Sequence, residues 1–142
     1  RRVVRLDQLP VGKPKEFSVL GSRQDAWTVY ADEIIGRVWL VRHTDESVEG
    51  ADAKVDAYSA RCPHLGCSIQ FAGPRGDFVC PCHDAVFDLQ GEAVRTGKQG
   101  RKNPAPRDMD SLVCRVVQDA EAWWIEVEYQ DFELGVHEKV AT

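Results

Sequence analysis

The chain has 142 residues, a length that suits one domain, and its 43% hydrophobic and 29% charged residues are typical of a globular protein rather than a disordered one. A formal net charge of −5 argues against nucleic-acid binding. A membrane-spanning helix needs about 20 consecutive apolar residues, and every apolar run in this sequence is much shorter. The chain begins with two arginines, and its only methionine is Met109. We therefore expect a soluble fragment from which an N-terminal signal or anchor has been removed.

Short apolar runs with a period of two predict β-strands along most of the chain. In the first half these runs cover residues 17–20, 27–30, 37–42 and 55–59, and Gly21-Ser22 gives a turn signal between the first two. In the second half, residues 112–117 and 123–129 form the clearest hairpin. Strands at this density predict an all-β fold, an antiparallel β sandwich or barrel.

The stretch from residue 61 to residue 107 differs from the rest, because it holds six of the eleven glycines and most of the prolines. Such a stretch inside a β domain is either a disordered insertion or an assembly of loops held by something other than a hydrophobic core. Four of the five cysteines lie within it, which favours the second interpretation.

Two short motifs in this stretch combine cysteine with histidine, Cys62-Pro63-His64-Leu65-Gly66-Cys67 and Cys80-Pro81-Cys82-His83-Asp84-Ala85. Two thiolates and two imidazoles from opposed loops can hold a tetrahedral zinc ion or an iron–sulfur cluster. Structural zinc sites usually draw on Cys-x-x-Cys knuckles or a helical pair of histidines, and neither occurs here. The residues alone leave both kinds of site open.

At these motifs the sequence resembles the Rieske iron–sulfur proteins of cytochrome bc-type complexes, whose pattern is Cys-x-His-x-Gly-Cys followed by Cys-x-Cys-His. The segment Asn103-Pro104-Ala105-Pro106 looks like the proline loop of that family, which covers one side of the cluster. The resemblance implies a single Rieske-type domain, with a β base formed by residues 1–60 and 109–142 and an inserted, loop-rich cluster-binding subdomain over residues 61–108.

The resemblance also implies one 2Fe–2S cluster and assigns residues to it. Cys62 and Cys80 would ligate one iron, His64 and His83 would ligate the other, and Cys67 and Cys82 would form a disulfide. The remaining positions expected beside the cofactor are Leu65, Gly66, Ala85, Phe87 and Pro104. Gly66 is expected to serve backbone geometry, and Leu65 is either a core residue or, as in the family, exposed toward a membrane subunit.

The chemistry of this ligand set follows from charge. A doubly positive oxidised core with two thiolates and two neutral imidazoles has zero net charge, so it accepts an electron more readily than a four-thiolate site. Rieske centres accordingly span about −150 to +300 mV, against about −400 mV for plant-type ferredoxins. Each imidazole keeps a second nitrogen whose pKa depends on the metal's oxidation state, so His83 and His64 are the expected hydrogen acceptors for a quinol.

The second motif departs from many high-potential family members, which carry serine and tyrosine hydroxyls where this sequence has Ala85 and Phe87. Those hydroxyls donate hydrogen bonds to sulfur and stabilise the reduced cluster. We therefore expect a potential toward the lower end of the family, suited to menaquinol. An ionised Asp84 would lower it further.

The function implied by the resemblance is electron transfer from a quinol to a c-type cytochrome, in a complex with a cytochrome b-type membrane subunit. Such a subunit is not catalytic alone, and it lies on the extracytoplasmic (periplasmic) face of the membrane, held by an N-terminal anchor. The alternatives are the small Rieske subunit of a periplasmic oxidoreductase such as arsenite oxidase, a Rieske ferredoxin or oxygenase domain, and a zinc module. The expected disulfide and the short chain argue against the ferredoxin and oxygenase alternatives.

The other candidate residues have ordinary interpretations. Cys114 is expected in the core of a strand, and His43 and His137 are expected at the surface. The basic residues near the proline loop are expected on a solvated loop; they are Lys98, Arg101, Lys102 and Arg107.

Overall fold

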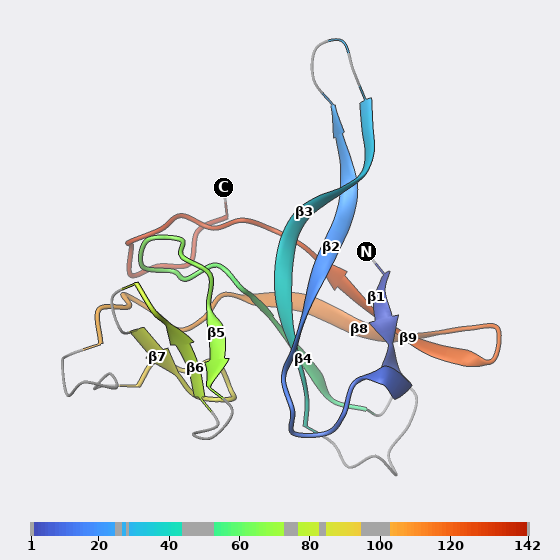
Figure 1. Cartoon of the computed structure of the whole chain (residues 1–142), viewed down its shortest axis with the longest axis horizontal. Helices are drawn as coiled ribbons and strands as arrows, with labels where there is room; N and C mark the ends of the chain where they lie inside the picture. The colour runs from blue at the N-terminus through green and yellow to red at the C-terminus, as the bar shows by residue number, and fades with distance from the viewer. Residues whose placement is uncertain are drawn as a thin grey trace. The chain divides into compact units, whose positions relative to one another are not determined.

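The computed structural model describes residues 2–24, 27, 29–43, 53–72, 77–82, 85–94 and 103–141. Their regular structure is β apart from a single 3-10 turn, η1 (Leu6–Gln8), which confirms the all-β prediction. The strands are β1 (Arg2–Arg5), β2 (Lys15–Gln24), β3 (Val29–Arg42), β4 (Val55–Ser59), β5 (Gln70–Ala72), β6 (Asp77–Cys80), β7 (Ala85–Phe87), β8 (Ser111–Asp119) and β9 (Ala122–Glu128) (Figure 1). Within these described ranges no helix has the length and apolarity needed to cross a bilayer.

Contacts along the chain define two compact units. The first comprises Arg1–Ala57 and Leu112–Tyr129, and the second comprises Tyr58–Ser111 and Gln130–Thr142. The C-terminal residues thus belong to the unit that carries both cysteine motifs. The assignment of a base and a cluster-binding subdomain to particular residues stays a prediction.

The first unit is built on a six-stranded sheet with the order β1-β9-β8-β4-β3-β2. The β8–β9 hairpin is confirmed, with Asp119 paired to Ala122 across a tight turn. Along β9, Ile125 and Val127 are buried, and the residue between them is more exposed, as alternation across a half-buried strand requires. Cys114 on β8 is half-buried rather than fully buried; burial, and then the charge of Asp56, raises its pKa to about 11.

The hairpin of β2 and β3 differs from the structure that the sequence predicted for residues 17–42. The predicted turn at Gly21-Ser22 is wrong: β2 continues to Gln24, which pairs with Val29 at the start of β3. Gly21 instead lies inside β2, where a Cβ atom would come within 2.8 Å of Cδ1 of Ile35. Glycine is needed there for close approach of a side chain, not for chain reversal.

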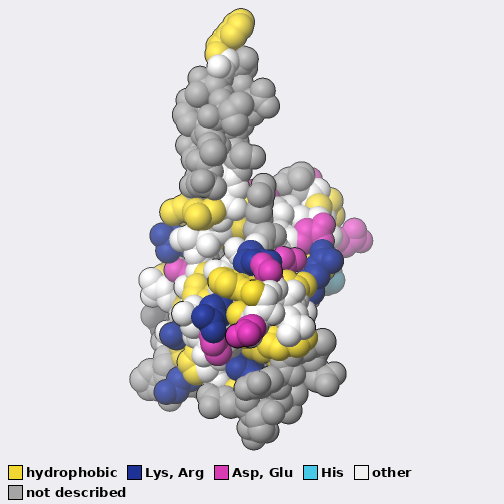
Figure 2. Space-filling model, turned by 90° about the vertical axis from the view of Figure 1, so that its right-hand side faces the viewer, with side chains coloured by type: hydrophobic (Ala, Val, Ile, Leu, Met, Phe, Trp, Pro, Cys, Tyr) yellow, Lys and Arg dark blue, Asp and Glu magenta, His cyan; other side chains and the backbone are white. Residues whose placement is uncertain are grey.

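The two strands β2 and β3 continue beyond the other strands of their unit as a twisted ribbon (Figure 1). Trp27, between the strands, is 96% exposed, and hydrophobic atoms stand at the free end of the ribbon in Figure 2. The adjacent residues Ile34 and Ile35 of β3 lie at an irregularity in the pairing with β2, and both are exposed. The ribbon therefore exposes apolar side chains within its unit.

Irregular pairing marks both outer strands of the six-stranded sheet. The register of β1 against β9 shifts between Arg2 and Val4. The register of β2 against β3 shifts twice, between Val19 and Leu20 and between Gly21 and Arg23. Such bulges increase the local twist of a strand.

The second unit contains a three-stranded sheet of order β5-β6-β7, with antiparallel pairing throughout. Phe78 on β6 is its buried centre and makes edge-to-face contacts with Tyr58, at a ring distance of 6.1 Å, and with Phe71, at 5.6 Å. The strands β6 and β7 pair up to Cys80 and Ala85. The second cysteine motif therefore occupies the connection at the end of this hairpin.

Candidate metal centre

The first motif forms a closed loop directly after β4. The backbone N–H of Cys62 donates to the carbonyl of Cys67 over 2.8 Å, and that of Gly66 donates to the carbonyl of Cys62 over 2.9 Å. Gly66 has a φ of 83°, in the left-handed region that favours glycine, so its expected role in backbone geometry is confirmed. Leu65, next to it, is 57% exposed, which excludes a core role within its unit.

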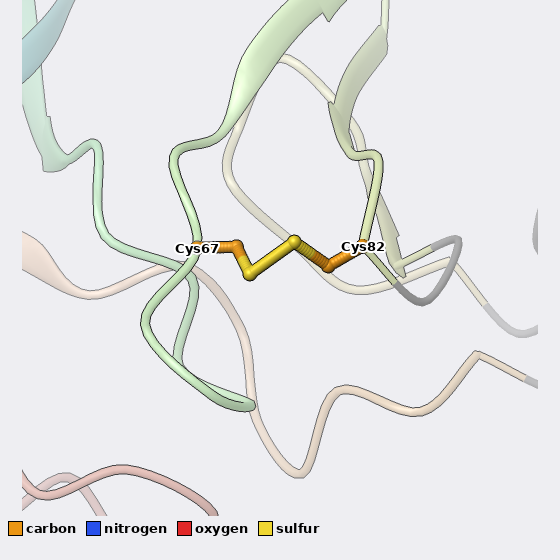
Figure 3. Close-up of a disulfide and its surroundings, with 2 residues drawn as sticks. All are labelled: Cys67 and Cys82. Atoms are coloured by element: carbon orange, nitrogen blue, oxygen red, sulfur yellow. A yellow bond between two sulfur atoms is a disulfide. The ribbon is translucent and has the colours of Figure 1, made fainter.

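A disulfide between Cys67 and Cys82 joins the two motifs, as the resemblance implied. Figure 3 shows it spanning from the loop of the first motif to the end of the β6 strand region. The two loops are thus covalently held against each other, which fixes the residues on either side of the bridge.

The two cysteines left free within the motifs lie together in the interior. Cys62 is 0% exposed and Cys80 is 2% exposed, and their side chains form a hydrogen bond. Burial raises the pKa of the Cys62 thiol to about 12, and Cys80 adds to the rise. The backbone N–H groups of His64 and Leu65 act in the opposite direction, because they donate to the Cys62 sulfur.

This thiol pair fits a metal site on the chemistry of its donors. Two adjacent buried thiols repel each other when both are ionised, and a metal ion relieves that repulsion by replacing their protons. The two backbone N–H groups already directed at the Cys62 sulfur suit a thiolate bound to metal. The sulfur of Cys80 also lies within 4.8 Å of both disulfide sulfurs, those of Cys67 and Cys82.

The two expected histidine ligands have different outcomes. His64 is half-buried, and its backbone contacts the Cys62 sulfur, but its imidazole is not part of the sulfur group around Cys80. His83 lies outside the described residues, together with Asp84. The ligand roles of both histidines therefore stay predictions.

The two positions that lack hydroxyl groups, the last residue of the second motif and the residue two places after it, lie on β7. Ala85 and Phe87 are both 0% exposed. A hydroxyl added at either position would be shielded from water, so its hydrogen bond would be made within the protein.

The proline loop is attached to this same strand by the side chain of Asn103. Its Nδ2 donates to the carbonyl of Val86 over 2.7 Å and to that of Val94 over 2.6 Å, and its Oδ1 accepts from the N–H of Ala105. Pro104 is half-buried beside it. Sequence reasoning missed this role, although asparagine that bonds to the backbone two residues ahead is a known turn signal.

Arg107, after the proline loop, contradicts the expectation of a solvated basic stretch. Its side chain is 6% exposed and is bound through two hydrogen bonds to Asp110, whose side chain is 4% exposed. The spacing of three residues between opposite charges is the signal that could have indicated this pair. Lys98, Arg101 and Lys102 lie outside the described residues.

Comparison with protein families agrees with this geometry. The sequence model described as "Rieske [2Fe-2S] domain" matches residues 1–115, which is most of the chain. The chain belongs to the Rieske [2Fe-2S] domain family. The cofactor of this Rieske domain is a 2Fe–2S cluster, and clusters of this class have two cysteine and two histidine ligands.

Relatives of this Rieske domain are subunits of larger complexes. It is 26% identical, over 80% of the chain and 59% of the relative, to the cytochrome b6-f complex iron-sulfur subunit of Volvox carteri. It is 31% identical, over 66% of the chain and 51% of the relative, to the menaquinol:cytochrome c reductase iron-sulfur subunit of Bacillus subtilis. The chain thus spans roughly half the length of these relatives.

A solved structure supports the Rieske fold. The cyanobacterial plasma membrane Rieske protein PetC3 from Synechocystis PCC 6803 aligns with a TM-score of 0.53 at 21% identity. The alignment covers 89% of this chain and 98% of that protein. At this level of identity the likeness concerns the fold.

Restoring the missing hydroxyls in this Rieske domain should raise its midpoint potential. For each of Ala85→Ser and Phe87→Tyr, one hydrogen bond that favours the reduced cluster by about 1 kcal/mol corresponds to a rise of about 40 mV for a one-electron couple. Redox titration followed by EPR measures the shift. Phe71→Tyr, on β5 of the same sheet, is the matched control and should leave the potential unchanged. If neither of the first two variants raises the potential, the absent hydroxyls do not set it.

Proposed function

We propose that this chain is the Rieske electron-transfer subunit of a membrane cytochrome bc-type complex. It accepts an electron and a proton from a quinol, with menaquinol as the expected species, and passes the electron to a c-type cytochrome. The observation that carries the proposal is the buried Cys62–Cys80 thiol pair beside the Cys67–Cys82 disulfide. The names of the relatives, cytochrome b6-f and menaquinol:cytochrome c reductase subunits, support the choice of complex.

Four side chains would hold the cofactor. Cys62 and Cys80 would bind one iron through sulfur, and His64 and His83 would bind the other through a ring nitrogen. When bound, a 2Fe–2S cluster supplies reversible one-electron transfer. The N–H groups of His64 and Leu65 stabilise negative charge on the Cys62 sulfur, and the burial of both cysteines excludes water from it.

The proton would be held by the histidines. An imidazole that binds metal through one nitrogen keeps the other available as a donor or acceptor. We assign hydrogen acceptance from quinol to that second nitrogen in His64 and His83. The exposed side chain of Leu65, adjacent to His64, offers an apolar surface to the cytochrome b-type subunit near the quinol.

The proposal includes the setting of the subunit. The division of residues into a base, 1–60 and 109–142, and a cluster-binding subdomain, 61–108, belongs to it. So do an N-terminal anchor upstream of this chain and a position on the extracytoplasmic side of an energy-transducing membrane. A small Rieske subunit of a periplasmic oxidoreductase such as arsenite oxidase remains the second candidate, and the names of the relatives favour it less.

Voltammetry of the purified protein across pH tests the proposal. The reduced protein should give the EPR signal of a 2Fe–2S cluster. Above the histidine pKa of the oxidised form, each electron should bring a proton, so the midpoint should fall by about 59 mV per pH unit. A colourless, EPR-silent protein with bound zinc would exclude the cluster. A midpoint that is independent of pH far into the alkaline range would exclude proton uptake at His64 and His83.

A further inference from the structure

The last residues of the described chain form a folded segment in the second unit, which we call the C-terminal clasp (residues 130–141). Phe132 and Ala141 form an isolated β-bridge, and the N–H of Glu133 donates to the carbonyl of Val140 over 2.8 Å. Phe132 is buried, with Nζ of Lys139 located 4.8 Å from its ring centre. Lys139 also donates to the carbonyl of Ser111 over 2.6 Å, which ties the clasp to the end of the proline-loop region.

The clasp contacts the loop of the first motif at three points. The N–H of Gly135 donates to the carbonyl of Pro63 over 2.8 Å. The side chain of Leu134 packs against Gly66, where an added Cβ would lie 2.9 Å from Leu134 Cδ1. At the base of the loop, Nη1 of Arg61 lies 3.8 Å from Oδ1 of Asp131. The residues on either side of His64 and Leu65 are therefore supported by the clasp.

Arg107 connects the clasp to the segment that follows the proline loop. Its Nη2 donates to the carbonyl of Glu133 over 2.7 Å, and its Nη1 donates to the carbonyl of Val136 over 2.8 Å. Its Nε and Nη2 bind the two carboxylate oxygens of Asp110 over 2.8 and 2.9 Å. One guanidinium thus holds both ends of the turn that contains Leu134 and Gly135.

The family match does not account for this arrangement. It ends at residue 115, whereas the clasp begins at residue 130. The clasp is thus a feature of this chain beyond the region that the family model describes.

We propose that Arg107 and the C-terminal clasp position the first cysteine motif, so that they determine how firmly Cys62 and His64 are held. Arg107 is a positioning residue in this arrangement, because it acts on the loop through the clasp. The inference rests on the proposed function for its consequence at the cofactor, but the mechanical support it describes does not.

Hydrogen exchange in the full chain, purified with its cluster, tests the support directly. The N–H groups of Gly66 and Gly135 report the loop and its contact with the clasp, because each donates one of the hydrogen bonds described above. Arg107→Gln should speed their exchange about tenfold or more, since it removes the ion pair and the bonds that hold the turn. Val140→Ala, which trims an exposed side chain of the same segment, should leave both rates at the wild-type value.

Arg107→Lys separates charge from positioning. A lysine keeps the positive charge but cannot bond to Asp110 and both carbonyls together. We therefore expect fast exchange at Gly66 and Gly135 in Arg107→Lys as well as in Arg107→Gln, and wild-type exchange in Arg107→Lys would show that the positive charge alone is sufficient. In both variants a chelator should remove the cluster faster than from the wild type.

The proposal and the proposed function can fail separately. Exchange at Gly66 that is unchanged in Arg107→Gln overturns the clasp, whatever the cofactor. If Arg107→Gln does not fold, Leu134→Ala replaces it, and unchanged exchange at Gly66 in that variant is equally decisive. A wild-type protein that binds no iron–sulfur cluster overturns the proposed function, and faster exchange in the variants would still support the clasp.

Discussion

Replacing Cys67 and Cys82 together by alanine should lower the free energy of unfolding by about 3 kcal/mol, the loss of chain entropy expected for a disulfide across 15 residues. We also expect the double variant to lose its cluster more easily than this loss of stability alone would explain. The bridge is the covalent connection between the loop that carries Cys62 and the hairpin end that carries Cys80. Without it, the two thiols are held together only by the packing of their own loops.

Urea unfolding followed by circular dichroism, with the visible absorbance of the cluster recorded in parallel, measures both consequences. The cluster should be lost at a lower urea concentration than the wild type requires. Cys114→Ala is the matched control, because it removes a cysteine of the first unit and leaves both motifs intact. Equal cluster retention in the double variant and in the wild type would contradict the role given to the bridge.

Asn103→Ala should destabilise the protein by about 2–3 kcal/mol, from the loss of three hydrogen bonds worth about 1 kcal/mol each. Asn103 is 9% exposed, and its side chain joins the proline loop to β7, so its removal detaches the loop from the strand that follows the second motif. Asn103→Asp should be at least as severe, because it replaces the amide donor by an oxygen that faces two carbonyls.

Thermal unfolding and the rate of cluster loss in a chelator measure this effect. Gln90→Ala is a suitable control, since its exposed side chain lies on the neighbouring turn after β7. A change in stability for Asn103→Ala that is no larger than the change for Gln90→Ala would show that the proline loop is held by other contacts.

The parts of the fold that sequence predicted correctly depend on local pattern. The strand β4 has the expected bounds, Val55–Ser59, and the β8–β9 hairpin lies where alternating residues and a short polar turn indicated. The prediction of a turn at Gly21-Ser22 was wrong because a glycine can permit either a reversal of the chain or the close approach of a neighbouring side chain. Only the position of Ile35, on another strand, decides between these uses.

In the candidate site, too, some features could be predicted from the sequence and others could not. The Cys67–Cys82 disulfide was predicted from the resemblance of the two motifs to the Rieske pattern, and the structure contains it. The burial of Arg107 could not be predicted, since it depends on carbonyl groups of Glu133 and Val136, far along the chain. A basic residue in a polar stretch is usually solvated. Arg107 is buried because a segment far along the chain, which contains Glu133 and Val136, packs against it.

The irregular pairing of the two outer strands of the six-stranded sheet has a consequence for behaviour at high concentration. An outer strand offers free N–H and C=O groups that can pair with the same strand of another molecule and begin aggregation. Here β1 is only four residues long and its pairing with β9 shifts after Arg2, and the pairing of β2 with β3 shifts twice. Neither strand presents a long, flat row of backbone groups to a second molecule. The outer strands of this sheet are therefore poor templates for intermolecular β-structure.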